Sequence, residues 1–121
     1  MRRAIAIGLC AILPVLPAAA ALAAGHDGNW SVLVVTERGA CDRAYRYDVT
    51  IANGRVRFDG APGIDVSGTV SPKGLVRVRI SGGSGHAEGS GHISGQSGTG
   101  IWRGSSGGGD SCAGRWEAAR R

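Results

Sequence analysis

Beyond residue 24 the sequence lacks any segment with the 3.6-residue apolar period of an amphipathic helix. Apolar and polar residues instead alternate strictly, in short stretches that end at Gly, Pro, Asn or Ser. This alternation is typical of strands with one buried face. A helical or mixed α/β domain is therefore excluded, and we expect an all-β domain.

The sequence also lacks the unbroken run of about 20 apolar residues that a transmembrane helix requires. Its N-terminal apolar stretch, residues 4–16, follows two arginines, contains a glycine and a proline, and leads into small residues. This order is that of a secretory signal peptide. We predict that residues 1–23 are a signal peptide, cut after Ala23 or Ala24. The remaining residues 24–121 then form a single domain without a stable membrane anchor, located in the periplasm or outside the cell.

Cysteine is scarce, and only Cys41 and Cys112 lie beyond the predicted signal peptide. The two lack a Cys-x-x-Cys spacing and a neighbouring histidine, which argues against a redox or metal site. In an exported protein they are expected to form a disulfide bond. Such a bond closes a loop of about 70 residues, for which chain entropy gives on the order of 4 kcal/mol.

Positive charge is modest, since the 14 Lys and Arg less the two arginines of the signal peptide leave 12, against 9 Asp and Glu. Dense basic clusters are absent, so a nucleic acid is not the expected partner. Arginines do recur on the polar faces of successive predicted strands. They predict a cationic stripe suited to an anionic component of the cell envelope: Arg46, Arg55, Arg57, Arg77 and Arg79.

Eight short strands follow from the alternation, and Asn53-Gly54 is a strong hairpin signal between the second and third. The apolar run Val32–Val35 suggests a strand covered on both faces or lying where a sheet closes. Glycines crowd between 82 and 114, where they permit tight coiling or mark a mobile segment. The pattern predicts an antiparallel meander closing into a barrel or barrel-like sandwich. The expected strands are 29–37, 45–51, 55–59, 64–70, 76–80, 86–94, 99–103 and 113–118.

Each tryptophan is preceded by a glycine two residues earlier, in Gly28-Asn29-Trp30, Gly100-Ile101-Trp102 and Gly114-Arg115-Trp116. A glycine beside an indole lets a neighbouring backbone or ring approach closely. We expect the three motifs to meet where the barrel closes. The tryptophans are interpreted as core residues, with stacking against a bound ligand as the alternative.

Groups that could carry catalysis are few, and no acid, base and nucleophile converge. Gly104-Ser105-Ser106-Gly107-Gly108 matches Gly-x-Ser-x-Gly but lacks the strand and helix that a nucleophile elbow needs. His86 and His92 would lie about 20 Å apart on one strand, too far to share a metal. Cleavage after Ala23 would expose Ala24-Gly25-His26, whose amine, amides and imidazole can hold Cu(II) or Ni(II). His26 is thus a conditional metal ligand, and no cofactor is predicted.

The chain resembles small exported, mostly uncharacterised proteins of rhizobium-type alphaproteobacteria, some loosely labelled haem-utilisation or adhesion exoproteins. The likeness covers nearly all of residues 24–121 and implies export rather than a particular activity. It rests on Gly28-x-Trp30-Ser31-Val32, Thr36-x-x-Gly39-x-Cys41-Asp42-Arg43-Ala44-Tyr45-Arg46-Tyr47, Ile51-Ala52-Asn53-Gly54 and Cys112-x-Gly114-x-Trp116-x-Ala118.

More distantly, the Gly28-x-Trp30 opening and the late Arg120 are similar to calycin barrels such as lipocalins and avidins, and to small periplasmic metalloprotease inhibitors on a comparable barrel. We therefore predict a non-enzymatic, exported β-barrel that acts as a binding or cell-envelope interaction module. The resemblance implies two alternatives, a carrier of a small apolar ligand and a periplasmic protease inhibitor.

Overall fold

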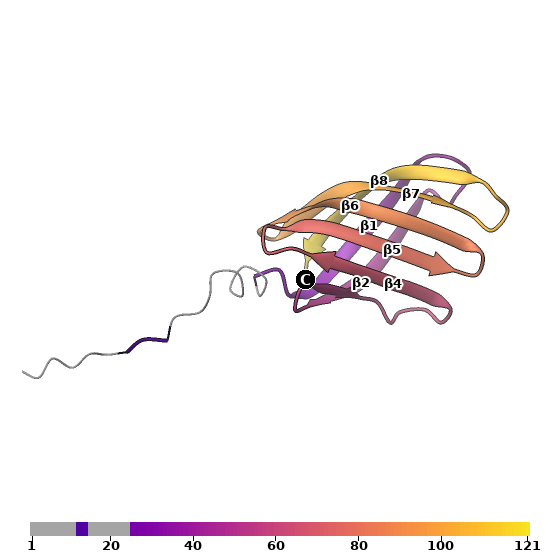
Figure 1. Cartoon of the computed structure of the whole chain (residues 1–121). Helices are drawn as coiled ribbons and strands as arrows, with labels where there is room; N and C mark the ends of the chain where they lie inside the picture. The colour runs from indigo at the N-terminus through magenta and orange to yellow at the C-terminus, as the bar shows by residue number, and fades with distance from the viewer. Residues whose placement is uncertain (1–11, 15–24) are drawn as a thin grey trace, which may run out of the picture.

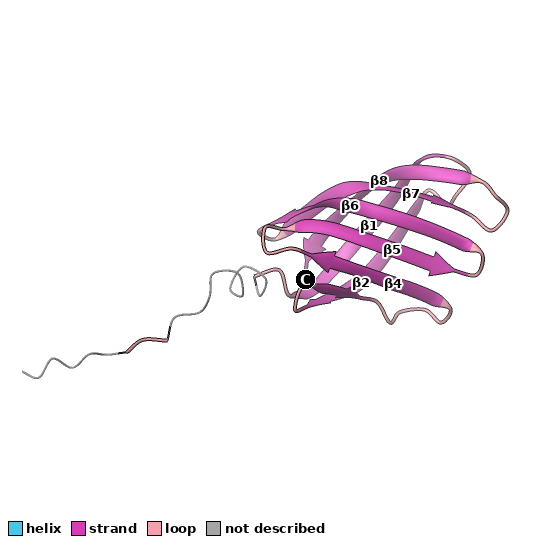
Figure 2. Ribbon diagram, in the orientation of Figure 1, coloured by secondary structure: helices cyan, strands magenta, loops and turns pink. Residues whose placement is uncertain are grey.

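The computed structural model describes residues 12–14 and 25–121 and folds the second range into a closed, all-antiparallel barrel (Figures 1 and 2). Each strand pairs with the next, and the last pairs with the first, which confirms the predicted meander and its closure as a barrel. No helix able to span a membrane occurs in these two ranges. The strands are β1 (Gly28–Arg38), β2 (Ala44–Ala52), β3 (Arg55–Arg57), β4 (Ile64–Val70), β5 (Leu75–Gly82), β6 (Gly85–Ser94), β7 (Ser97–Ser105) and β8 (Ser111–Arg120).

The two ends of the barrel differ in their connections. At one end, here called the base, tight turns join the strands, among them Asn53-Gly54, whose φ angles of 53° and 74° fit a type I′ hairpin. The C-terminus lies at this end, beside the point where the N-terminal segment enters (Figure 1). The opposite end, here called the mouth, carries the longer loops 39–43, 58–63 and 106–110.

The N-terminal segment plugs the base. The Asp27 carboxylate accepts hydrogen bonds from the backbone N–H groups of Asn53 at 2.8 Å and Gly54 at 3.2 Å. The Arg120 guanidinium donates to the carbonyls of Asp27, at 2.6 Å, and Gly25. Backbone groups that a turn and a chain end would otherwise leave unpaired are thereby satisfied.

The buried core fills only the base half of the barrel. Trp30 is 1% exposed, its indole N–H donates to the His26 carbonyl at 2.9 Å, and the Arg120 guanidinium lies 4.6 Å from its ring centroid. Such a cation over an indole face adds to the burial of the ring. The buried cluster is Trp30, Ile51, Val70, Val76, Ile93, Trp116 and Ala118.

Glycines between 82 and 114 lie largely in β6, β7 and β8, where they make room for two indoles. The register pairs Gly100 with Trp116 and Trp102 with Gly114, so two of the Gly-x-Trp motifs face each other reciprocally. A Cβ on Gly100 would stand 2.5 Å from the Trp116 ring. The Trp116 indole donates to the Ser90 carbonyl of β6 at 3.2 Å, and so crosses β7 over that glycine. The glycines within β6, β7 and β8 therefore belong to packed strands, whereas Gly107, Gly108 and Gly109 lie in the loop 106–110.

Candidate ligand-binding cavity

The mouth half of the barrel is hollow. Its inward side chains alternate with exposed ones as the register requires, yet they stay only half-buried because no side chain fills the centre. The cavity has a volume of about 520 Å³. Aliphatic side chains of β1 to β5 line one wall, and glycines with Trp102 and Trp116 line the other. The aliphatic members include Val32, Val34, Val49, Val56, Val66, Val78 and Ile80.

All six aromatic residues of the chain line this cavity or its mouth. Tyr47 meets Phe58 edge to face with ring centroids 5.3 Å apart, and Tyr45 stacks on Tyr47 at 6.0 Å. These three rings sit beside the mouth loops, at the start of β2 and just after β3. They form an apolar entrance, here called the aromatic rim.

Both tyrosines of the aromatic rim have a pKa above the ordinary value. Burial raises the pKa of the Tyr47 hydroxyl above its ordinary value, and neighbouring Tyr45 adds to the effect. The pKa of Tyr45 is raised first by burial and then by the nearby Asp42 carboxylate. No charged side chain is buried among the described residues, so the entrance and interior suit an uncharged, apolar group.

Polar groups of the cavity gather at the mouth. Among the lining residues, His86 and Glu88 lie near the start of β6, Ser105 ends β7, and Ser106 follows it. A molecule with an apolar body inside the barrel could therefore place a polar end here.

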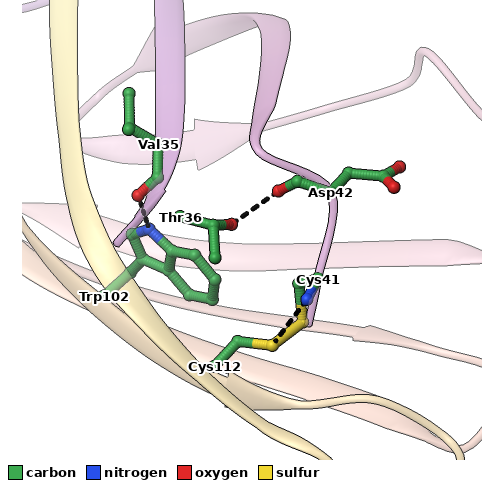
Figure 3. The surroundings of a disulfide bond; sticks show 6 residues. All are labelled: Val35, Thr36, Cys41, Asp42, Trp102 and Cys112. Atoms are coloured by element: carbon green, nitrogen blue, oxygen red, sulfur yellow. Dashed lines mark hydrogen bonds between the residues drawn. A yellow bond between two sulfur atoms is a disulfide. The ribbon is translucent and has the colours of Figure 1, made fainter. Parts of the chain in front are cut away.

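The predicted disulfide is present and lies at the mouth. Cys41, in the loop after β1, is bonded to Cys112 near the start of β8, and the backbone N–H of Cys41 lies 3.1 Å from the partner sulfur (Figure 3). Trp102 lies close by and donates its indole N–H to the Val35 carbonyl at 2.9 Å (Figure 3). The bond fastens a mouth loop to the strand beside the closure between β1 and β8.

The three tryptophans have different surroundings. Trp30 and Trp116, 1% and 8% exposed, belong to the buried cluster as the core interpretation predicted, whereas Trp102 is half-buried and packs against that cluster. Trp102 is therefore the indole most open to a ligand in the cavity. Only two of the Gly-x-Trp motifs face each other directly, because Trp30 of β1 is opposite Arg120 of β8.

The predicted arginine stripe lies wholly on the outer wall. Arg55 and Arg57 of β3 and Arg77 and Arg79 of β5 flank β4 and are exposed. Arg46 lies apart on β2, where it donates to the Ser31 hydroxyl at 3.0 Å. None of these arginines lines the cavity.

The conditional metal ligand His26 lies at the base, with Nε2 3.2 Å from the Pro72 carbonyl oxygen. Its predicted partner Ala24 falls outside the described residues, as does the predicted signal peptide except for 12–14. Within the described ranges, no three His, Cys, Asp or Glu side chains are grouped so as to hold a metal.

We did not predict the aromatic rim as a site from the sequence, although the alternation of apolar and polar residues contains a signal for it. Alternation already directs Tyr45, Tyr47 and Phe58 inward, and each lies next to a mouth loop. Apolar rings that point inward at the end of a barrel cannot all be buried in the hydrophobic core, because the chain around them consists of loops rather than strands.

Fold and cavity define the class as a closed eight-stranded antiparallel barrel with a hollow, apolar interior open at one end. Comparison with protein-family models, curated proteins and solved structures finds no match in any of the three.

Proposed function

We propose that this protein is a non-enzymatic binding protein that holds a small apolar molecule inside its barrel. The single observation that supports this most is the cavity of about 520 Å³, lined by aliphatic side chains and by every aromatic residue of the chain. Cavities that hold small molecules usually measure about 300 to 1,000 Å³ and are mostly apolar.

The energetics favour such an occupant. Inward valines and isoleucines of the mouth half stay partly exposed, so a ligand that covers them removes apolar surface from water. Each buried methylene of the ligand contributes about 0.8 kcal/mol. A charged group would have no partner in the interior and would stay near His86, Ser105 and Ser106 at the mouth.

The cavity can be tested by filling it. Ile80 points into the cavity from β5, and the next residue, Ser81, is exposed on the outer wall of the same strand. Ile80→Trp should lower the affinity for N-phenyl-1-naphthylamine, a neutral apolar fluorophore, by about tenfold or more, since lost apolar contact of 1.4 kcal/mol corresponds to tenfold. Ser81→Trp adds the same ring outside and should leave the affinity unchanged.

The readout is the rise in probe fluorescence on titration, with circular dichroism to show that both variants keep the fold. Quenching of tryptophan emission by the bound probe provides a second signal, since Trp30, Trp102 and Trp116 all line the cavity. Equal affinities for the two variants would place the probe outside the barrel and would contradict the proposal. Failure of the unmodified protein to bind any apolar probe would do so as well.

We further propose that the protein works outside the cytoplasm, after loss of residues 1–23. The disulfide between Cys41 and Cys112 is compatible with an oxidising compartment and supports this setting. Mass analysis of the protein from its native cells should find Ala24 or Gly25 as the first residue, whereas an intact Met1 would contradict export.

A further inference from the structure

The outer wall of the barrel carries a second hollow, separate from the cavity. A groove of about 800 Å³ runs across the strands from β3, through β4 to β8, to the end of β1. We call it the oblique groove. Small residues and arginines make up most of its lining. The small residues are Ser67, Gly68, Thr69, Gly89, Ser90, Ala113 and Gly114, and the arginines are Arg38, Arg55, Arg77, Arg79 and Arg103.

Strand register arranges the arginines along this groove. Arg55 of β3 pairs with Thr69 of β4, and Thr69 pairs in turn with Arg77 of β5. On its other side, Arg77 pairs with Ser90 of β6. Neighbouring strands lie about 4.8 Å apart, so the two arginines stand about 10 Å apart with only a threonine between them. The same line continues through Ile101 and Arg115 and contains no carboxylate.

Positive charge in the oblique groove exceeds negative charge. Five arginines and two glutamates line it, an excess of 5 − 2 = 3. Both glutamates already have an arginine partner, Glu88 with Arg103 at 3.8 Å and Glu37 with Arg115 at 3.3 Å.

Three exposed arginines, Arg55, Arg77 and Arg79, form no ion pair within the described part of the chain. The nearest carboxylate on β4, Asp65, lies two residues beyond Ser67 toward the mouth and does not line the groove. A guanidinium group can donate two parallel hydrogen bonds to one carboxylate. Successive arginines thus offer repeated sites for the acidic groups of a chain.

We propose that the oblique groove binds an acidic polysaccharide chain, a function separate from that of the cavity. A groove that crosses several strands fits a linear polymer, whereas a flat bilayer surface cannot enter it. The hydroxyls of Ser67, Thr69 and Ser90 can exchange hydrogen bonds with sugar hydroxyls.

Single-stranded nucleic acid fits this wall less well than a polysaccharide does. Proteins that bind single strands stack the bases on aromatic side chains. Of the six aromatic residues, only Trp102 lines the oblique groove, and its ring packs against the buried cluster and donates its indole N–H to the Val35 carbonyl. Apart from the exposed Ile101, the side chains that the groove offers to a ligand are therefore mainly guanidinium and hydroxyl groups.

The experiment compares two pairs of charge removals in the otherwise unchanged protein. Arg77→Gln with Arg79→Gln removes two charges from the groove, and Arg43→Gln with Lys73→Gln removes two from exposed loops at opposite ends of the barrel. Polygalacturonate is the acidic probe and neutral dextran the control. Binding is measured by calorimetry at low and high salt, and circular dichroism confirms folding.

We expect polygalacturonate, and not dextran, to bind, with an affinity that falls as salt screens the charges. The groove variant should bind about tenfold or more weakly, since each charged hydrogen bond is worth roughly that factor, and the loop variant should change little. Ile80→Trp should bind polygalacturonate normally, which separates this site from the cavity. Equal weakening by both charge removals would overturn the proposal, as would groove-dependent binding to phosphatidylglycerol vesicles without binding to polygalacturonate.

Discussion

At the scale of single residues, glycine and tryptophan act as one packing unit in this barrel. Gly100 leaves the space that the Trp116 ring occupies, and the ring covers the backbone that the glycine leaves bare. The indole N–H groups of Trp102 and Trp116 each reach a carbonyl two strands away, across the strand between them. Buried indole nitrogens are thereby satisfied without a polar side chain in the core.

Substitution of Gly100 tests this packing. Gly100→Ala places a methyl group against Trp116 and against the Ser90 carbonyl, and should lower the free energy of unfolding by about 1 to 3 kcal/mol through overpacking. Gly89 also faces inward, but its added Cβ would meet ordinary contacts of 3.6 Å or more. Gly89→Ala should therefore be neutral or stabilising by up to about 1 kcal/mol. Urea unfolding followed by Trp fluorescence measures both, and equal losses would contradict this account of the packing.

We expect Tyr47 to make the stability of the fold decrease at alkaline pH. Because burial raises its pKa in the folded state above the ordinary value near 10, the neutral hydroxyl stabilises the fold fully below that pH. This contribution is lost as pH rises through the folded pKa. The melting temperature should fall as the pH rises above about 10, and Tyr47→Phe should reduce that fall. An unchanged alkaline loss in Tyr47→Phe would assign it to Tyr45 or to other groups.

At the scale of elements, the mouth is held by a covalent bond while the base is held by hydrogen bonds. The Cys41–Cys112 bond joins the loop after β1 to β8, close to the ladder between β1 and β8 that closes the barrel. At the base, Asp27 and Arg120 fasten the N-terminal segment to the last strand and to a hairpin turn. Hydrogen bonds in the mouth loops are local, such as those from the Thr36 hydroxyl to the Asp42 carbonyl at 2.6 Å and from the Ser106 N–H to the Asp110 carbonyl at 2.9 Å.

Removal of the disulfide should weaken the whole fold. Chain entropy assigns on the order of 4 kcal/mol to a bond across 71 residues, so Cys41→Ala with Cys112→Ala should lower the free energy of unfolding by about that amount. Urea unfolding with and without reductant measures the loss. The reductant should destabilise the unmodified protein and leave the double variant unchanged. A loss below about 1 kcal/mol would show that the closed sheet alone sets stability.

Strand positions were largely predictable from the sequence, and their ends were not. Alternation placed all eight strands, and 64–70 agrees residue for residue with β4. The third strand was predicted to extend to Asp59 but ends at Arg57, because β4 pairs only with Arg55 and Val56 and no partner continues the ladder. The strand predicted as 99–103 is longer in the structure, because the small residues Ser97, Gly98, Gly104 and Ser105 carry no alternation signal yet pair across the sheet. The strand predicted as 113–118 also extends, to Ser111–Arg120.

At the scale of the whole molecule, the barrel is asymmetric along its axis. Large side chains, an N-terminal plug and tight turns close the base, while the mouth half keeps a cavity behind three aromatic rings. The outer wall differs again: arginines flank β4 there, and none of them lines the cavity. An apolar ligand and an acidic polymer would therefore occupy different surfaces of one small domain.

The sequence by itself determined the class of fold, the strands and the pairing of Cys41 with Cys112, because period-two alternation and two available thiols are local or countable signals. Only the tertiary structure decided that the interior is hollow. An inward valine gives the same alternation pattern in the sequence whether or not other side chains fill the centre of the barrel. It also decided that the Gly-x-Trp motifs of β7 and β8 face each other, and that Arg55 and Arg77 flank one groove. Those facts depend on register between strands, which no single segment encodes.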